Sequence, residues 1–523
     1  MSLLGLDVGT TGCKAGVFSS GGQCLAMAYR EYAARHPKDG WAELDSREVW
    51  ARVQEVVAEV AARSAHDPVT ALSVSAMGEA VTPVSRDREI LGPCILSSDV
   101  RSGSGFNELL RFLGPKELFA ITGNLPGVNY SLPKLLWLRE HKPELYSRAD
   151  RMLLWSDLVL YLLGGEPLIG YGQASRTLLF DVSGECWSER LLKLSEIEVS
   201  KLSTPVPSGT VAGRVSEHMG RKLGLPPGVK LVVGSHDQCC NALGAGIVAP
   251  GRAVCGIGTF ECITPVYGRI PEPESMAQCG LNVEHHIVPG LYASFIYNQS
   301  GALVRWFRDT FARAEWQQAG PDVDIYDLLA REIPDEPTRL FTLPYFEITG
   351  TPGFVADASG VILGLKLGTT RGEILKSIME SVTLYLAEGV RALSFLGLET
   401  DEFVATGGGA RSDPWLQIKA DVFGVPFVRA AFTEGGVLGA ALLAGVASGV
   451  FCNYAQATNA WVSRGKMFEP DARRHQIYVE KSEAFRQLFP LLRTFLSENE
   501  EREIKRRSRP RADEVRAKPA PRD

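Results

Sequence analysis

A loop close to the start of the chain carries residue types that can bind phosphate groups. Gly9, Thr10 and Thr11 follow Asp7 between two short apolar runs in residues 4–18. Glycine permits a sharp turn whose successive N–H groups face an anion, and the threonine hydroxyls add donors. Because the Asp7 carboxylate would repel phosphate unless a cation lay between them, it predicts a Mg²⁺ ion held through water. The loop does not match a Walker A motif, and an ordinary hairpin with a glycine-rich turn is the alternative.

Two later segments also contain glycine-rich turns that predict ligand contact. In residues 253–263, two apolar runs bracket a turn with Gly258 and Thr259. This second hairpin of the phosphate-binding type indicates an internal duplication, although Gly-Thr turns are also common without one. Further on, a predicted strand runs into three glycines, which include Gly408 and Gly409, and a helix follows. Glycines at such a junction let a ligand approach the positive end of the helix closely.

A carboxylate follows one of the buried strands. Residues 231–233 are fully apolar, and Asp237 lies just past their end. This is where α/β sheets bind ligands, so Asp237 could accept a proton from a substrate hydroxyl. The alternative is that Asp237 caps the helix that begins near Gln238. The neighbouring His236 either contacts substrate or is a hydrogen-bonded structural histidine, and the spacing fits no zinc site.

An acid and a base stand two residues apart after another short strand. Asp99 and Arg101 both have the reach to hydrogen-bond a ligand with many hydroxyl groups. The alternative is a surface ion pair, which contributes little to stability. Taken alone, the pair favours this second interpretation.

Alternating strands and helices must position these candidate residues. Residues 72–76 and 231–233 predict buried strands, and a capping box at residues 45–48 opens an amphipathic helix. A second long helix is predicted from about residue 374 to 393. A chain of 523 residues exceeds what one hydrophobic core supports, so two or more domains are expected.

The chain is predicted to have three parts. Glycines and a proline in residues 244–251 mark a boundary, which gives an N-terminal domain at 1–246 and a C-terminal domain at 247–497. Residues 498–523 are polar and rich in arginine, and they contain almost no large apolar side chains. Such a segment does not bury enough surface to offset its ordering entropy, so it is predicted to be a basic disordered tail. Part of it could continue the preceding helix as a solvated extension.

The composition is that of an ordinary globular protein, with 45% hydrophobic and 22% charged residues. The net charge of −6 argues against broad nucleic-acid binding. None of the 10 cysteines forms a C-x-x-C pair, so neither a disulfide scaffold nor a zinc site is expected. The sequence opens without a signal-peptide pattern and has no run of about 18 apolar residues. We therefore expect a cytoplasmic protein with no membrane partner and no nucleic-acid partner.

Together these motifs resemble the FGGY carbohydrate kinases, the family that contains xylulokinase, glycerol kinase and gluconate kinase. The resemblance runs over residues 4–445, and its most specific part is the family's C-terminal signature at residues 360–380. Residues 133–141 are similar to the other signature region, and residues 40–45 and 178–181 look like smaller family blocks. The resemblance implies two actin-like (ribonuclease H-like) α/β domains with an interdomain cleft. It also implies ATP mainly against the second domain and sugar against the first.

The resemblance further implies roles for individual residues. Asp7 matches the acid associated with Mg²⁺, and Asp237 matches the catalytic base. Asp99 and Arg101 fall on the pair that binds sugar. The positions that contact nucleotide in the family match Gly9, Thr10, Thr11, Gly258, Thr259, Gly301, Gly408, Gly409 and Asp413. The last of these positions is often Asn in the family.

Three departures from the family pattern lie on the sugar side. Ser97 stands where many xylulokinases carry Trp, and His236 stands where Gly is usual. Residues 77–80 read Met-Gly-Glu-Ala in place of a Gln-Met-His-Gly stretch. We predict that Glu79 and His236 contribute to substrate binding, although Glu79 could equally pair with Arg101.

The sequence therefore predicts an ATP- and Mg²⁺-dependent kinase of a small sugar or polyol, with a xylulose-like ketose as the first candidate. One alternative is a sugar-acid kinase of the gluconate type, in which Arg101 or His236 binds the carboxylate. Another is a non-catalytic actin-like module that binds ATP. Homodimers are common in the family that the chain resembles, so a homodimer is possible.

Overall fold

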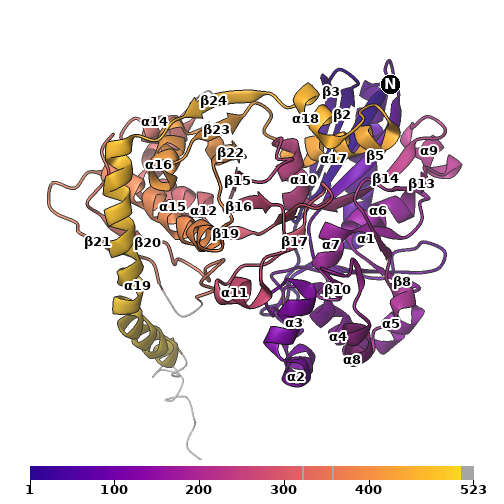
Figure 1. Ribbon diagram of the computed structural model, residues 1–523, viewed down its shortest axis with the longest axis horizontal. Helices are drawn as coiled ribbons and strands as arrows, with labels where there is room; N and C mark the ends of the chain where they lie inside the picture. The colour runs from indigo at the N-terminus through magenta and orange to yellow at the C-terminus, as the bar shows by residue number, and fades with distance from the viewer. Residues whose placement is uncertain (321–322, 356–358, 508–523) are drawn as a thin grey trace, which may run out of the picture.

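The computed structural model describes residues 1–320, 323–355 and 359–507, which form two α/β halves that are each built on one large sheet (Figure 1). The first sheet has six strands in the order β13-β14-β5-β1-β2-β3. These strands are β1 (Ser2–Val8), β2 (Gly12–Ser19), β3 (Cys24–Glu31), β5 (Val69–Ala76), β13 (Val211–Arg214) and β14 (Lys230–His236). β1 and β2 form an antiparallel hairpin, whereas β1, β5 and β14 run parallel.

The second sheet has the order β17-β18-β16-β15-β22-β23-β24, and β19 also pairs with β16. Its strands are β15 (Arg252–Ile257), β16 (Phe260–Tyr267), β17 (Glu284–His285), β18 (Tyr292–Ala293), β19 (Ile296–Gln299), β22 (Glu402–Thr406), β23 (Phe427–Ala430) and β24 (Arg464–Phe468). β15 and β16 form an antiparallel hairpin, and β15, β22 and β23 run parallel. Both sheets thus place two parallel strands beside the first strand of a hairpin. This repeat confirms the predicted duplication of an α/β unit.

Helices and short strand pairs complete the first half. The helices are α1 (Ser46–Arg63), α2 (Gly103–Leu113), α3 (Pro115–Thr122), α4 (Ser131–His141), α5 (Pro143–Arg148), α6 (Trp155–Leu163), α7 (Tyr171–Ser175), α8 (Glu189–Ser195), α9 (Glu217–Leu223) and α10 (Asp237–Gly244), with the 3₁₀ helix η1 (Val199–Lys201). The short strands are β4 (Glu43–Leu44), β6 (Thr82–Val84), β7 (Cys94–Ile95), β8 (Arg151–Leu153), β9 (Leu168–Gly170), β10 (Phe180–Asp181), β11 (Cys186–Trp187) and β12 (Thr204–Val206).

The Asp45 side chain caps the start of α1, which is one half of the predicted capping box. The Asp45 carboxylate accepts hydrogen bonds from the N–H groups of Arg47 and Glu48, which would otherwise lack partners at the helix start. The apolar face of α1 is buried against β2 and β3.

The second half carries the remaining helices. They are α11 (Pro273–Gln278), α12 (Gly301–Phe311), α13 (Arg313–Gln318), α14 (Ile325–Ala330), α15 (Arg371–Phe395), α16 (Asp413–Phe423), α17 (Gly435–Ser448), α18 (Tyr454–Trp461) and α19 (Ala472–Arg507), with the 3₁₀ helix η2 (Gly408–Arg411) and the short strands β20 (Phe341–Leu343) and β21 (Val361–Leu363). Figure 1 shows α19 along the outer side of this half. In the described ranges, no helix has both the length and the apolar character that a membrane crossing needs.

The C-terminal helix is longer than the sequence pattern predicts. α19 continues to Arg507, so the first ten residues of the segment predicted as a tail at 498–523 are helical. These ten residues continue α19, which agrees with the alternative of a helical extension and not with the predicted disorder. Residues 508–523 lie outside the described residues.

Two helices connect the halves of the molecule. α17 comes late in the chain but packs on α10 and on β1 and β5 of the first sheet. Figure 1 shows α17 close to α10 and β5. Glycines make this approach possible, because a Cβ atom on Gly244 would overlap the backbone of Gly435 and one on Gly439 would overlap the backbone of Cys240. The predicted domain boundary between residues 246 and 247 therefore does not divide the hydrophobic core into two. The reason is that α17, which follows this boundary in the sequence, packs in the core under the first sheet.

Candidate active site

The first glycine loop is an open hairpin turn between β1 and β2. The Gly9 N–H donates to the Gly12 carbonyl at 2.9 Å, and the Tyr32 hydroxyl donates to the Gly9 carbonyl at 2.7 Å. Thr10 and Thr11 at the tip are exposed to solvent. The turn is therefore fixed at its base, and its threonine hydroxyls remain accessible to a ligand.

Asp7 lies at the base of this loop and is partly buried. The Ser75 hydroxyl donates to its Oδ1 atom at 2.6 Å. Burial raises the pKa of Asp7 to about 6, although the hydrogen bond from Ser75 opposes this shift, and the nearby Asp237 carboxylate adds to it. Two carboxylates this close repel each other, and oxygen is the ligand type that Mg²⁺ prefers. The donor set of Asp7 and Asp237 thus fits a divalent cation at this position.

The second glycine loop joins β15 to β16 and also supports the start of α12. The Gly258 N–H donates to the Phe260 carbonyl at 3.0 Å, and the Gly301 N–H donates to the Gly258 carbonyl at 3.0 Å. A Cβ atom on Gly301 would overlap that same carbonyl, so only glycine fits there. Arg305, one turn into α12, donates to the Thr259 hydroxyl at 3.4 Å. The second glycine loop, the start of α12 and the Arg305 guanidinium therefore form one surface.

The third glycine turn closes the same region from the other side. β22 ends at Thr406, and Gly407 has a φ of +80°, which lets the chain turn sharply into η2. A cavity of about 770 Å³ lies between this turn and the second loop. Six of the predicted nucleotide contacts line it, namely Gly258, Thr259, Gly301, Gly408, Gly409 and Asp413. Apolar walls come from Leu329, Met379 and Trp415, and a cavity of this size and character suits a nucleotide.

Asp413 borders this cavity but is already paired. Its carboxylate binds the Arg429 guanidinium and, at 2.5 Å, the Lys466 ammonium. Partial burial alone would raise the pKa of Asp413, but the hydrogen bonds from Lys466 and Arg429 hold it below the usual range. Asp413 therefore anchors the start of α16 to β23 and β24 at the edge of the cavity.

Asp237 is the first residue of α10, directly after β14, as the sequence predicts. His236 occupies the N-cap position, so Asp237 does not act as the helix cap. The Asp237 side chain is 34% exposed and therefore accessible to a substrate. Its Oδ1 atom accepts a hydrogen bond from Gln238 at 3.1 Å and lies 3.1 Å from Nε2 of His236.

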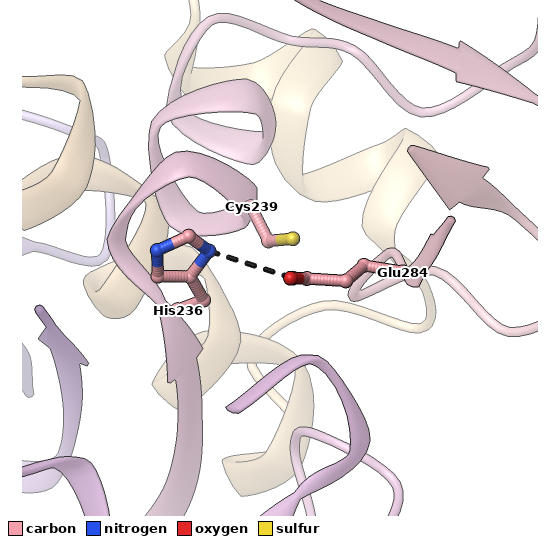
Figure 2. Close-up of side chains that lie close together, drawn as sticks. All are labelled: His236, Cys239 and Glu284. Atoms are coloured by element: carbon pink, nitrogen blue, oxygen red, sulfur yellow. Dashed lines mark ion pairs between the residues drawn. The ribbon is translucent and has the colours of Figure 1, made fainter. Parts of the chain in front are cut away.

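A buried network of charges extends from His236 to Glu79. Nδ1 of His236 lies 3.5 Å from Oε2 of Glu284, and the other oxygen of Glu284 accepts a hydrogen bond from Arg176 at 2.6 Å. Arg176 also pairs with Glu79, which lies after β5 with a φ of +31°. Figure 2 shows how His236 and Glu284 face each other beside the Cys239 thiol. Glu79 thus pairs with Arg176, and the alternative in which Glu79 pairs with Arg101 is wrong.

Arg176 and Glu284 were not identified from the sequence. Arg176 stands just before the family block at 178–181, which was a usable signal. Glu284 lies on a two-residue strand of the other half, and nothing in its local sequence points to the site.

Asp99 and Arg101 form a buried pair, so the alternative of a surface ion pair is wrong. The Arg101 side chain is 2% exposed and binds Asp99 at 2.6 Å and Glu43 at 2.5 Å. Its guanidinium also lies 3.7 Å from the centre of the Trp41 ring. Asp99 additionally accepts a hydrogen bond from the Ala42 N–H at 2.6 Å. The Asp99–Arg101 pair thus holds residues 41–43 against β7, the short strand that precedes Asp99.

Two family models match the chain. The model described as "FGGY family of carbohydrate kinases, N-terminal domain" matches residues 2–244, and the model of the C-terminal domain matches residues 281–448. Together they cover most of the chain.

Individual relatives agree with these matches. A xylulose kinase of Bacillus subtilis (strain 168) is 27% identical over 93% of this chain and 96% of its own length. An autoinducer-2 kinase of Escherichia coli (strain K12) is 26% identical over 93% of this chain and 94% of its own length. The crystal structure of a xylulose kinase from Rhodospirillum rubrum matches with a TM-score of 0.84 and 28% identity, and it covers 95% of this chain and 100% of its own. The predicted two-domain actin-like fold is thereby confirmed.

Proposed function

Because the chain belongs to the FGGY family of carbohydrate kinases, and is thus an ATP-dependent phosphotransferase with an alcohol group as acceptor, we propose that it phosphorylates a small neutral ketose or polyol. The first candidate is a xylulose-like ketose, in line with the xylulose kinases among its relatives. Asp237 is the proposed base. ATP is proposed to occupy the cavity between the second and third glycine turns, with its phosphates directed to Gly9, Thr10 and Thr11.

One observation supports this assignment most strongly. Asp237 is partly exposed at the start of α10 and lies close enough to Asp7 for the two charges to interact. Asp7 in turn lies at the base of the first glycine loop. The proposed base and the proposed phosphate site are thus neighbours, as a direct transfer between substrate and ATP requires.

The chemistry asks little of the protein beyond placement and charge. As the substrate hydroxyl attacks the γ-phosphate, Asp237 accepts its proton and orients the oxygen. Mg²⁺ near Asp7, when bound, neutralises charge on the phosphates. The N–H groups and hydroxyls of the glycine loops bind the same phosphates. Closure of the two halves around both ligands would exclude water and so suppress hydrolysis of ATP.

The charges around Asp237 favour a neutral substrate over a sugar acid. Arg176 is shared by Glu79 and Glu284, and His236 lies between Glu284 and Asp237. Arg101, the other predicted anchor for a carboxylate, is enclosed with Asp99 and Glu43. A carboxylate on the substrate would have to compete for Arg176, His236 and Arg101 with the protein carboxylates that already bind them. Substrate hydroxyl groups can instead donate hydrogen bonds to those protein carboxylates.

The test is ADP release by the purified protein with Mg-ATP and a panel of ketopentoses, tetruloses, polyols and sugar acids. We expect one strong response from a neutral ketose or polyol. Asp237→Asn should lower turnover by roughly 10²–10⁴-fold and leave ATP affinity nearly unchanged. If ATP binding were lost in this variant, Asp237 would not be the base.

Three further expectations belong to the same proposal. The enzyme is proposed to act in the cytoplasm, and a homodimer is possible because FGGY kinases often form one. The N-terminal domain at 1–246 is proposed to hold the sugar and the C-terminal domain at 247–497 the nucleotide. Within this division, α17 returns to the first sheet and should move with it.

A further inference from the structure

We propose that His236, Cys239 and Glu284 form a binding site for a Zn²⁺ ion. The site joins the start of α10 in the first half to β17 in the second half. It differs from the position between Asp7 and Asp237, because Asp237 faces the other nitrogen of the His236 ring. The zinc site does not depend on the proposed function.

Three buried side chains bring one nitrogen, one sulfur and one oxygen atom together. The ligand atoms of His236, Cys239 and Glu284 all lie within 4.8 Å of one another. His236 and Cys239 come from the beginning of α10, whereas Glu284 comes from a strand of the second sheet. Figure 2 shows the three side chains converging on one place. The third ligand is distant in the sequence, so the spacing of residues gave no sign of this site.

Two of these ligand atoms are buried and lack a partner. Nδ1 of His236 and Oε2 of Glu284 face each other at 3.5 Å, but neither makes a hydrogen bond within the described part of the chain. The His236 side chain is 9% exposed and that of Glu284 is fully buried. Lone pairs that face each other in the interior are unfavourable unless a cation lies between them. The two atoms therefore point to a bound cation.

The distances suit a tetrahedral metal. Zinc binds nitrogen and oxygen ligands at about 2.0–2.2 Å, so two such ligands stand roughly 3.4 Å apart in a tetrahedral site. The observed 3.5 Å between Nδ1 of His236 and Oε2 of Glu284 is close to this value. The other separations, which reach up to 4.8 Å, need to shorten by about 1 Å to give three bonds. A water molecule would then take the fourth position.

The outer hydrogen bonds are of the kind that metal ligands have. A histidine bound to a metal usually donates its other N–H to a carboxylate, and a ligating carboxylate is itself hydrogen-bonded. Nε2 of His236 lies 3.1 Å from Oδ1 of Asp237, and the second oxygen of Glu284 accepts a hydrogen bond from Arg176 at 2.6 Å. These partners orient the two unpartnered atoms toward the same place.

The types of ligand select zinc over magnesium. Thiolate and imidazole groups favour zinc, whereas Mg²⁺ prefers oxygen ligands. The thiol of Cys239 has only a weak contact, a 3.5 Å hydrogen bond to the His285 carbonyl. On binding, its proton leaves to solvent, and the thiolate and the Glu284 carboxylate then neutralise the charge of the ion. The ion would thus tie α10, which also carries Asp237, to the second half.

The experiment measures zinc bound to the full chain by equilibrium dialysis against ZnCl₂. Metals are first removed with a chelator, and the buffer contains excess Mg²⁺ but no sugar and no ATP. We expect about one zinc ion per chain, and Cys239→Ser and Glu284→Gln should each weaken its binding by at least roughly 10–100-fold. Cys240→Ser is the matched control, because this neighbouring buried thiol contacts the Ser235 carbonyl at 3.7 Å and lies outside the cluster, so it should bind zinc like the wild type.

A second readout identifies the ligand even if Cys239→Ser folds poorly. Co²⁺ in place of zinc should give a thiolate-to-cobalt charge-transfer band in the wild type and in Cys240→Ser, and Cys239→Ser should lack it. A combined Cys24→Ser, Cys186→Ser and Cys452→Ser variant removes exposed thiols and should keep the band. Zinc should also raise the melting temperature of the wild type, because it binds the folded state.

Several results would overturn the proposal. A wild-type chain that binds no zinc contradicts it, since water or a proton would then occupy the cluster. Zinc that Cys239→Ser binds as tightly as the wild type would be adventitious, and a cobalt band that disappears with the exposed thiols would have the same meaning. Because the dialysis contains neither sugar nor ATP, it is independent of the kinase assay. If zinc binds as expected but no panel sugar is phosphorylated, only the proposed function fails.

Discussion

Two adjacent glycines in the third turn allow nucleotide binding to be separated from stability. A Cβ atom on Gly408 would meet open space beside the cavity, with no atom of the described chain within 4 Å. A Cβ atom on Gly409 would instead overlap Cγ2 of Ile257 and stand 3.2 Å from the Trp415 ring, closer than normal contact. The methyl group of an alanine would thus enter the proposed nucleotide site at position 408 and the hydrophobic core at position 409.

The expected magnitudes differ accordingly. Gly409→Ala forces the buried Ile257 to shift, and such overpacking costs about 1–3 kcal/mol. Gly408→Ala should leave stability unchanged or raise it by about 0.4–1 kcal/mol through the unfolded chain. If ATP lies against this turn, the new methyl group of Gly408→Ala obstructs it at a similar cost of about 1–3 kcal/mol. This cost corresponds to roughly a 5- to 150-fold loss of affinity.

The assay pairs calorimetric titration of a non-hydrolysable ATP analogue with thermal melting of each variant. Gly408→Ala should bind the analogue weakly and melt like the wild type, whereas Gly409→Ala should melt earlier. Gly368→Ala is the matched control, since a Cβ atom there also meets open space and Gly368 does not line the cavity. If Gly408→Ala bound the analogue as tightly as the control, this cavity would not be the nucleotide site.

Two further predictions concern buried charges. Lys419→Met removes the cation from the fully buried carboxylate of Glu261 and should cost about 3–5 kcal/mol, seen as a lower urea midpoint. Lys116→Met breaks only the exposed pair with Glu274 and should leave that midpoint unchanged; equal effects would contradict the argument. Burial raises the pKa of Asp157 from 3.8 to about 7, so the folded state keeps a proton that the unfolded state releases. The free energy of unfolding should therefore fall between about pH 4 and 7, by on the order of 4 kcal/mol. Asp157→Asn should lack that fall in denaturation measured across this range, and an identical pH dependence would refute the assignment.

The glycine turns were predictable because their chemistry is local. A glycine loop between two apolar runs specifies a hairpin, and Gly9 and Gly258 lie in such turns. Gly408 lies in a turn of the other predicted kind, from a strand into a helix. Asp237 was placed correctly for a related reason, since a carboxylate at the end of a buried parallel strand reaches the edge of the sheet. In each case, neighbours within a few residues determine where the side chain lies.

The charge pairs were not predictable, because their partners are far apart in the sequence. Glu79 meets Arg176, which lies 97 residues later, and Arg176 meets Glu284, which lies 108 residues further on. The burial of Arg101 was not predictable from the sequence either, because the ring of Trp41, in an earlier segment, packs over its guanidinium. The spacing of Asp99 and Arg101 indicated a pair, but whether water reaches it depends on tertiary packing.

The starts of α10 and α17 meet at the junction where catalysis is proposed to occur. α10 begins with Asp237, and a Cβ atom on Gly436, in the first turn of α17, would stand 3.1 Å from Oδ1 of Asp7. Both helices therefore direct their positive ends toward the first glycine loop, where the phosphates of ATP are proposed to lie. Glu434, just before α17, binds Lys14 of β2 at 2.5 Å and ties this end to the first sheet. Because the same two helices connect the halves, any rotation between the halves must pass through the elements that carry the base. We therefore propose that closure on substrate is coupled to the alignment of Asp237, the proposed base.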